Sequence, residues 1–307
     1  MRARRHLLIG LMVLVPVMAV QTRSTDLPAR LSDTGVDASE SRLAFAPQYP
    51  LWSDGATKRR WVTLPDDASI DATRPDHWDF PDGTKFWKEF SVGGRKVETR
   101  MLWKRNGEWT FASYVWNEAQ TEATLAPPEG LTTSVEVAPG RRHQIPSVDE
   151  CRACHVSDRV EVLGFTALQL SDDRDPNAIH GEPVRPGMVT LSQLLSTGRL
   201  TNAPSTWATR PPRIEAADPE TRSVLGYLST NCGSCHNRDG SIPSVNLSLK
   251  SYTADATHTR HASFPLPLML SRMTSRRPSS QMPPLGTQVV DAEALARLKR
   301  WTERGSR

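Results

Sequence analysis

The sequence predicts an α+β protein, with an N-terminal antiparallel β domain followed by two small α-helical domains. Seven of the nine tryptophans fall between Trp52 and Trp116, among runs of residues typical of strands. The dipeptides Gly93-Gly94 and Asn106-Gly107 interrupt these runs as two-residue hairpin turns do. In the C-terminal half, two segments each combine a C-x-x-C-H pentapeptide with the signals of a capped helix.

The composition is that of a globular protein without membrane-spanning bundles. At 307 residues and 34.1 kDa, the chain is long enough for two or three domains, since ~100–200 residues per domain is usual. It is 37% hydrophobic and its mean hydropathy is -0.47. The formal net charge is +4, but Arg2, Arg4 and Arg5 lie in the first 19 residues, which contain no acid. The rest of the chain is close to neutral, so we expect no nucleic-acid partner.

Residues 1–19 are typical of an export signal. Three arginines precede an apolar run from Leu7 to Val20, and Val17 and Ala19 are the small residues that a cleavage site requires. The run of about 14 apolar residues is shorter than the ~20 that span a bilayer. An uncleaved leader that associates with the membrane is the alternative. In both cases the folded part is exported, and a periplasmic location follows. Residues 20–40 lack periodicity and are predicted to form a flexible tether.

Residues 41–145 are predicted to form a tryptophan-rich β domain with its own core. Two-residue turns at both dipeptides pair Phe86 with Met101, Phe90 with Val97 and Trp103 with Thr110. One face then collects apolar side chains: Phe86, Phe90, Val97, Met101, Trp103, Ala112, Tyr114 and Trp116. The other face is mixed, and we expect a second sheet or the C-terminal domains to cover part of it: Glu89, Glu98, Arg100, Lys104, Trp109, Phe111 and Val115. The tryptophans fit core packing, and a sugar-binding or aromatic-binding surface is the alternative.

The four cysteines occur only in the pentapeptides Cys151-Arg152-Ala153-Cys154-His155 and Cys232-Gly233-Ser234-Cys235-His236. This is the attachment sequence of c-type haem. Two thiols three residues apart can each bond a vinyl group at one edge of the porphyrin, and the imidazole that follows can ligate the iron. The sequence therefore predicts two covalently attached haems.

Other uses of four cysteines fit the spacing less well. An exported protein with four cysteines would ordinarily form two disulfides. A zinc site built from two C-x-x-C pairs would place them roughly 15–20 residues apart, whereas 77 residues separate Cys154 from Cys232. A thioredoxin-like redox pair would lie beside a βαβ pattern, which is absent.

Residues 213–307 are predicted to form the second cytochrome c-like domain. Asp218-Pro219-Glu220 begins a helix that ends at the second pentapeptide, and Asp291 begins a last helix with an apolar face. Between them, Met282 precedes Pro283 and Pro284, which restrict the loop. We expect Met282 to be the sixth ligand of the second haem, opposite His236, with these substitutes: Met269 and Met273.

Residues 146–212 are predicted to form the first haem segment, in which Thr190 and Gln193 cap a later helix that Gly198 ends. The distal ligand of this haem has three candidates. Met188 lies in a Pro-Gly-Met loop, His180 would give bis-histidine ligation, and an open sixth position would leave the iron free for other ligands.

Five segments recur here in the order seen in a known family: Tyr49–Ala56, Phe80–Lys85, Val97–Arg100, Tyr227–Cys232 and Met282–Gly286. Over roughly residues 45–303 the chain resembles a family of bacterial dihaem c-type cytochromes, with a β-rich N-terminal region ahead of two haem-binding segments. The resemblance implies haem binding and electron transfer, and it implies no substrate. It carries over these residues by position: Cys151, Cys154, His155, Cys232, Cys235, His236 and Met282.

Three functions fit these patterns. The leading expectation is a periplasmic electron carrier, in which two haems exchange single electrons with redox partner proteins. The second is a peroxidase-like dihaem oxidoreductase whose first haem has an open coordination site. The third is a binding module in which the β domain docks a polymer or an enzyme.

Overall fold

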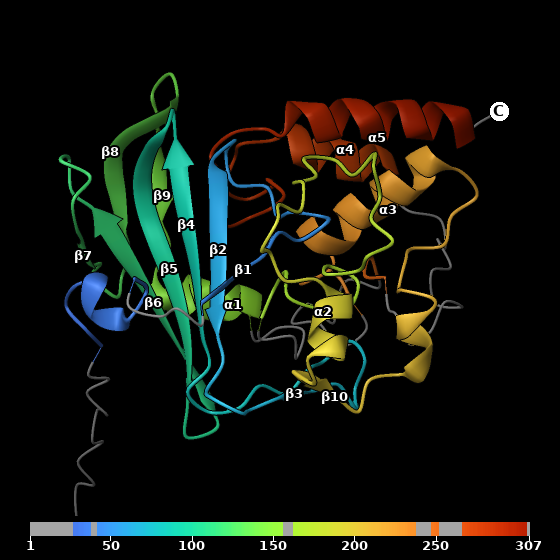
Figure 1. The fold of residues 1–307 in the computed structure, drawn as a ribbon. Coiled ribbons are helices and arrows are strands. Elements are labelled where there is room, and N and C mark those ends of the chain that lie inside the picture. The colour runs from blue at the N-terminus through green and yellow to red at the C-terminus, as the bar shows by residue number, and fades with distance from the viewer. Residues whose placement is uncertain (1–26, 38–41, 156–161, 238–246, 252–265, 306–307) are drawn as a thin grey trace, which may run out of the picture.

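The computed structural model describes residues 27–37, 42–155, 162–237, 247–251 and 266–305, and it has an α+β fold (Figure 1). A six-stranded antiparallel sheet has the order β1-β2-β4-β5-β6-β7. Its strands are β1 (Leu43–Ala44), β2 (Thr57–Thr63), β4 (Lys85–Val92), β5 (Arg95–Arg105), β6 (Glu108–Trp116) and β7 (Ala123–Leu125). The predicted signal peptide, residues 1–19, lies outside the described residues.

Two small ribbons accompany this sheet. Strand β3 (Ile70–Asp71) pairs in parallel with β10 (Leu200–Thr201), although 128 residues lie between them. Strand β8 (Leu131–Ala138) forms a hairpin with β9 (Arg141–Ile145), an element that the sequence analysis did not predict. Val135 of this hairpin packs against the buried residues Ala56, Phe90 and Val97.

Both predicted hairpins are confirmed. Val92 pairs with Arg95 and Arg105 pairs with Glu108, so that Gly93-Gly94 and Asn106-Gly107 form the two turns. All four turn residues have positive φ, between 52° and 80°, which glycine and asparagine adopt most readily. The predicted pairing of Trp103 with Thr110 is also correct.

The predicted register of β4 is wrong by one residue. An irregularity between Phe90 and Ser91 shifts the strand, so Phe86 pairs with Leu102 and Phe90 pairs with Glu98. A shift of one residue moves every side chain to the opposite face of a strand. Phe86 and Phe90 therefore leave the face that was predicted for them, and Glu89 replaces them there.

The two faces of the sheet have different coverings. The face that we call the inner face points toward the C-terminal half, and it carries Val62, Phe86, Leu102 and Phe111. The opposite, outer face carries Trp87, Met101, Ala112 and Tyr114. The expectation that the mixed face is covered is thus confirmed, because the C-terminal half packs on it.

Residues 27–37, expected to belong to a flexible tether, instead pack against the outer face. Leu31 is 3% exposed, and its backbone N–H donates to the carbonyl of Ala123 at 2.9 Å. The indole of Trp87 donates to Thr34 Oγ1 at 3.0 Å, next to the short 3-10 helix η1 (Ser32–Thr34). The prediction failed because Leu31 and Val36 are isolated apolar residues in a polar stretch, without a period that signals burial.

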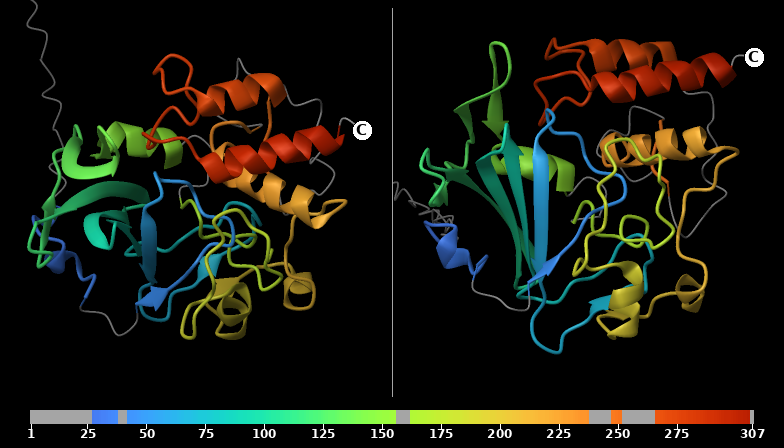
Figure 2. Two further views of the ribbon diagram at one scale, coloured as in Figure 1. Left: turned by 90° about the horizontal axis from the view of Figure 1, so that it is seen from above. Right: turned by 45° about the horizontal axis from the view of Figure 1, so that its top comes forward.

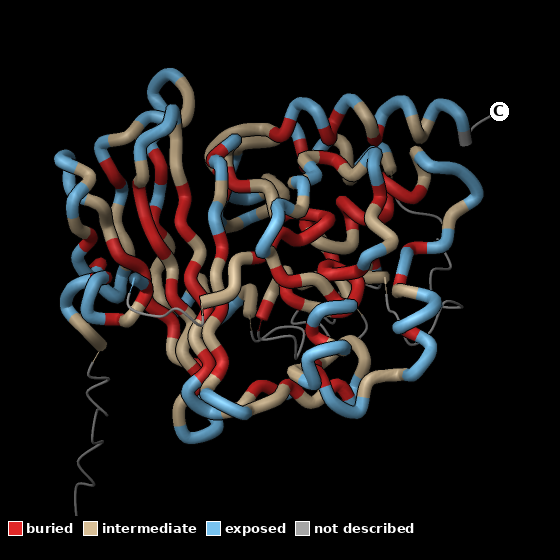
Figure 3. The backbone as a smooth tube through the Cα atoms, in the orientation of Figure 1, coloured by how far each residue is buried: buried red, intermediate tan, exposed pale blue. Residues whose placement is uncertain are grey.

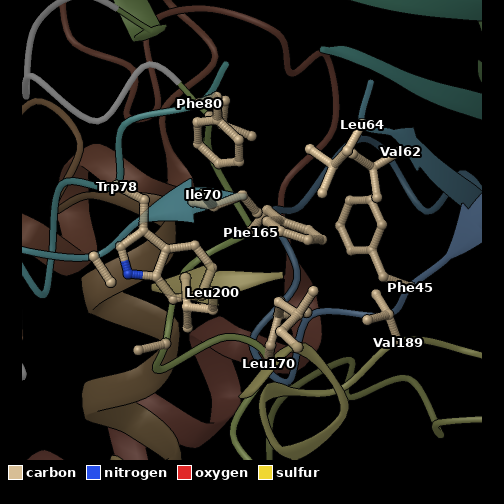
Figure 4. Close-up of a cluster of buried hydrophobic side chains, with 14 of the residues drawn as sticks. Phe45, Val62, Leu64, Ile70, Trp78, Phe80, Phe165, Leu170, Val189 and Leu200 are labelled. Atoms are coloured by element: carbon tan, nitrogen blue, oxygen red, sulfur yellow. The ribbon is translucent and has the colours of Figure 1, made fainter. Parts of the chain in front are cut away.

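The β domain and residues 146–212 share one hydrophobic core, so the predicted boundary at 145/146 does not divide the structure. Phe165 lies at the centre of this core (Figure 4), with its ring centroid 4.9 Å from that of Phe45 and 5.1 Å from that of Phe86. Leu191 and Leu194 of α2 (Leu191–Ser196) pack into it, as does Trp207 of the 3-10 helix η2 (Ser205–Ala208). The predicted capping box of Thr190 and Gln193 is present.

Three helices form a second core beside the sheet. They are α3 (Pro219–Asn231), α4 (Leu266–Thr274) and α5 (Ala292–Gly305). Leu228, Met273 and Leu298 meet in this core, and α5 is exposed along its outer side (Figure 3). Asp291 accepts a hydrogen bond from Ala294 N at 3.0 Å and caps α5 as predicted. Helix α4 was not predicted.

The first pentapeptide belongs to α1 (Val148–His155), which lies between the sheet and helices α3 to α5 (Figure 2). Within the described residues, every helix is either too short or too polar to cross a bilayer.

Candidate functional site

Both pentapeptides open into one cavity of about 460 Å³ between the sheet and the helices. The segments come from opposite sides of this space, since one belongs to α1 and the other follows α3. All six residues predicted for haem attachment and proximal ligation line the cavity: Cys151, Cys154, His155, Cys232, Cys235 and His236.

The first pentapeptide is positioned by a capped but exposed helix. Ser147 and Glu150 form a capping box at the start of α1, with hydrogen bonds of 2.9 and 3.1 Å. The helix has no buried residue, and Cys151 contacts the core that the sheet shares with residues 162–207. The ring of His155 lies 5.2 Å from that of Phe111 on the inner face of the sheet.

The second pentapeptide is positioned by a deeply buried helix. Asp218 caps α3 through Glu220 N and Thr221 N, with Pro219 in the first turn, as the sequence predicts. The chain turns after Cys232, whose carbonyl accepts from His236 N at 2.8 Å. Gly233 is required there, because a Cβ atom on it would lie 2.3 Å from the carbonyl oxygen of Ser229.

The four cysteines are free thiols in an apolar setting. Burial, with a contribution from Cys235, raises the pKa of Cys154 to about 11. Burial and Cys235 also raise the pKa of Cys232 to about 12. The influence of Cys235 on Cys154 reflects how close the two pentapeptides lie. Protonated thiols of this kind are poor nucleophiles, which argues against a catalytic cysteine.

His236 has the properties that an axial imidazole requires. Burial, and then Arg272, lower its pKa below the ordinary value, which favours the neutral ring that binds metals. Its Nδ1 atom is buried and has no hydrogen-bond partner within the described residues. Together with buried thiols at the attachment spacing, this donor set fits a c-type haem.

The structure brings Met282 to the same cavity, together with Met269 and Met273. Met273 is 6% exposed and belongs to the core of α3 to α5. Met282 lies in the loop before α5, where its backbone N–H donates to the carbonyl of Arg272 at 3.0 Å. All three thioethers predicted as ligand or substitute therefore lie near the second pentapeptide.

Met188 and His180 do not line this cavity. They line a second pocket, which borders the cavity at Leu51, Trp52 and Arg60, so the structure does not support Met188 as a ligand of the first haem. Met188 Sδ accepts a hydrogen bond from Arg185 N at 3.3 Å. His180 stacks on Trp52 and its Nε2 lies 2.9 Å from the carboxylate of Asp291. A short loop with a methionine resembles a ligand loop in sequence, but β1 directs this loop elsewhere through its bridge to Ala44.

A buried ionic cluster that the sequence analysis missed lies on the sheet side of the cavity. Arg100 Nη2 and Nε donate to the carboxylate of Glu98 at 2.6 and 3.0 Å. His143 of β9 adds a contact of 2.8 Å to the same carboxylate, which is 0% exposed. Burial acts to raise the pKa of Glu98, but Arg100 and His143 outweigh it and hold the pKa at about 2. Arg100 was predicted only as part of a polar face.

Residues 49–54 connect the sheet to the second pentapeptide. Trp52 N donates to Asn231 Oδ1 at 2.7 Å, immediately before Cys232. Asp54 accepts from Gln288 N and Val289 N at 2.8 and 2.9 Å, just after the Met282 loop. Four of the five segments that carry the resemblance contribute side chains to the lining of the cavity, and Phe80–Lys85 packs beside it.

The chain matches no protein-family model, no curated protein and no solved structure. Within the described residues, no group of three or more His, Cys, Asp or Glu side chains is arranged around a common point as ligands of a bare metal ion. The assignment of a function therefore depends on the residues of the cavity itself.

Proposed function

We propose that this protein is a periplasmic dihaem c-type cytochrome that passes single electrons between redox partner proteins. The observation that carries the proposal is that both C-x-x-C-H pentapeptides, distant in sequence, line the same cavity. A haem c at each site supplies reversible one-electron chemistry at iron.

The residues of the chain have separate tasks in this proposal. Cys151 and Cys154 hold the first haem and His155 ligates it. Cys232 and Cys235 would hold the second haem, and His236 and Met282 are the residues that would ligate its iron. Because both pentapeptides line the same cavity, the two haems would lie close enough for electrons to pass from one to the other. The mostly apolar walls exclude water, and they tune the reduction potentials through burial.

The proposal also includes a cytochrome c-like organisation of residues 213–307. Helix α3 delivers the pentapeptide, a methionine loop follows, and α5 packs across α3 through Leu228 and Leu298. The first haem segment differs, because it takes its core from the sheet. This segment is therefore the half of the pair that depends on the β domain.

Intact mass and a spectroscopic redox titration test the proposal together. We expect exported protein to be heavier than its polypeptide by two haems and to titrate as two one-electron centres. Expression without residues 1–19 serves as the control, and it should give colourless apoprotein. Exported protein that carries one haem or none would contradict the proposal.

One observation favours a second candidate, the dihaem oxidoreductase. Of the two side chains predicted as distal ligands of the first haem, Met188 and His180, neither lines the cavity among the described residues. An open position at that iron would allow a small molecule such as peroxide to bind. Cyanide added to the oxidised protein distinguishes the two candidates, because it shifts the spectrum of one haem in the oxidoreductase and of neither in the electron carrier.

A further inference from the structure

The sheet side of the cavity carries a row of three cations. Arg60 of β2 pairs with Lys88 of β4, and Lys88 pairs with Arg100 of β5, so the three residues lie side by side on the inner face. All three line the cavity that the pentapeptides share. Electron transfer alone gives no reason for three cations side by side on one wall of the cavity.

The two cations at the ends of the row, Arg60 and Arg100, have carboxylate partners. Arg60 donates to both oxygens of Glu182, at 2.7 and 3.0 Å. Arg100 makes the corresponding bidentate pair with Glu98. The side chain of Lys88, between them, has no hydrogen bond or ion pair with any residue that the structure describes, and its ammonium lies 4.9 Å from the ring centroid of Phe90. The row therefore has one more cation than its own carboxylates neutralise.

The surroundings of Lys88 make an uncompensated charge costly. Burial lowers its pKa well below the ordinary value, and Arg60, Lys58 and Arg100 lower it further, with Glu182 the only opposing group. A buried cation without an anion is destabilising, and a carboxylate supplied by a ligand removes that penalty. The cavity is thus suited to a ligand that brings negative charge to the middle of the row.

We propose that Lys88, between Arg60 and Arg100, binds a propionate carboxylate of the haem attached to Cys151 and Cys154. This inference rests on the proposed function and adds to it the group that anchors the free edge of the first haem. It also assigns a binding role to three residues of the β domain.

The direction of the row fits the shape of the cofactor. Arg100 lies close enough to Cys151 and Cys154 for each of these thiols to affect its pKa. Adjacent strands are ~4.8 Å apart, so the row runs about 10 Å from Arg100 across Lys88 to Arg60. The propionates of a c-type haem project from the edge opposite the thioether bonds. A haem held by Cys151 and Cys154 near Arg100 would be able to extend a carboxylate along the row toward Lys88.

The test compares Lys88→Met with Lys85→Met in exported full-length holoprotein. Lys85 lies on the same strand but on the outer face, where its Nζ donates to the carbonyl of Thr34 at 2.8 Å. Removal of the Lys88 charge leaves a propionate unneutralised and disfavours the added electron. We expect the reduction potential of one haem to fall by at least 59 mV, a tenfold change in the equilibrium constant of a one-electron couple. Lys85→Met should leave both potentials unchanged, and Lys88→Arg should restore the wild-type value.

Resonance Raman spectra provide a second readout, because propionate bending modes respond to the hydrogen bonds of the carboxylate. We expect such a mode to shift in both Lys88→Met and Lys88→Arg. In Lys85→Met, no propionate mode should shift. Two haems by mass with unchanged potentials and unchanged propionate modes in Lys88→Met would overturn this inference and leave the dihaem assignment intact. An equal fall of both potentials in Lys88→Met and Lys85→Met would also overturn it. Exported wild-type protein without haem would instead overturn the proposed function.

Discussion

The two pentapeptides share the C-x-x-C-H pattern, but they lie in different environments. The first belongs to an eight-residue helix without buried side chains, against a sheet that presents Arg60, Lys88 and Arg100. The second follows a 13-residue helix with eight buried residues, and three methionines surround it: Met269, Met273 and Met282. One side of the cavity therefore offers charge, and the other offers thioethers and tight packing.

In the proposed dihaem protein, this difference means that one attachment motif serves two kinds of haem site. The motif determines the covalent bonds and the proximal imidazole, whereas the reduction potential depends on the distal ligand, on nearby charges and on burial. In the proposed holoprotein the second site resembles a self-contained cytochrome core. The first site is completed by a β domain that has no attachment motif of its own. The following variants test how far this contrast extends.

Removal of each cysteine pair gives the largest expected effects. We expect Cys232→Ala/Cys235→Ala to lose at least about 4 kcal/mol of stability, which is what a ligand at a thousand times its Kd supplies. Cys232 packs in the core of α3 to α5, so loss of the second haem exposes the centre of that core. Cys151→Ala/Cys154→Ala should lose clearly less, because α1 buries no side chain. Denaturant unfolding, with mass spectrometry to count the haems, measures both; equal losses would contradict the contrast.

The Glu98 cluster should stabilise the sheet side of the cavity. Glu98→Gln removes the anion between Arg100 and His143, and breaking a buried pair of this kind costs about 3–5 kcal/mol. Glu215→Gln is the control, because Glu215 and its partner Arg213 are both exposed and such a pair is worth about 0–1 kcal/mol. Urea unfolding at neutral pH measures both, and equal costs would contradict the assignment of Glu98 as a buried anchor.

The stability difference between wild type and Glu98→Gln should also depend on pH. The pKa of Glu98 falls from 4.5 to about 2 on folding, so its contribution is fully present above pH 4.5 and is lost as the pH falls through about 2. The stability difference between wild type and Glu98→Gln should therefore shrink across this interval. A difference that stays constant down to pH 2 would show that the carboxylate is not responsible.

Sequence reasoning was most successful where the signal is local. The Gly93-Gly94 and Asn106-Gly107 turns, the Asp218 cap and the apolar face of α5 follow from neighbouring residues, and the structure confirms them. The register of β4 failed because an irregularity at Phe90/Ser91 leaves no mark in the alternation of residues. The core around Phe165, which the β domain shares with residues 146–212, was not predicted for another reason. It joins residues that are far apart in the chain.

For the candidate site as well, residues with a local sequence signal were predicted and residues whose role depends on distant packing were missed. Spacing alone predicted the six pentapeptide residues and the proline-braced loop predicted Met282, and the structure places all seven around one cavity. The buried pair Glu98–Arg100 could not be separated from an ordinary polar strand face, because burial of that face depends on what packs there. Met188 was misplaced because a loop sequence predicts a local shape but not the direction in which the loop points.

The methionine side of the comparison is tested by two substitutions. We expect Met282→Ala to abolish the red charge-transfer band of methionine-ligated ferric haem and to lower one reduction potential, because a thioether favours reduced iron. Met273→Ala is the matched control. It should keep the band but cost about 2–5 kcal/mol of stability, because Met273 is 6% exposed in a packed core. If Met273→Ala removes the band and Met282→Ala does not, Met273 is the ligand.

The smallest effect is expected at Met188. A substitution there tests whether this residue is remote from the first haem, as its place in the second pocket indicates. Met188 lines the second pocket with Trp61 and does not line the cavity, although Arg60 borders both. Met188→Leu conserves volume, so its cost should be below ~1.5 kcal/mol, and the spectra and both potentials should match wild type. A haem that loses a ligand band or binds cyanide only in this variant would mean that Met188 reaches the first iron. The contrast between a charged first site and a thioether-rich second site would then fail, because both irons would have methionine ligands.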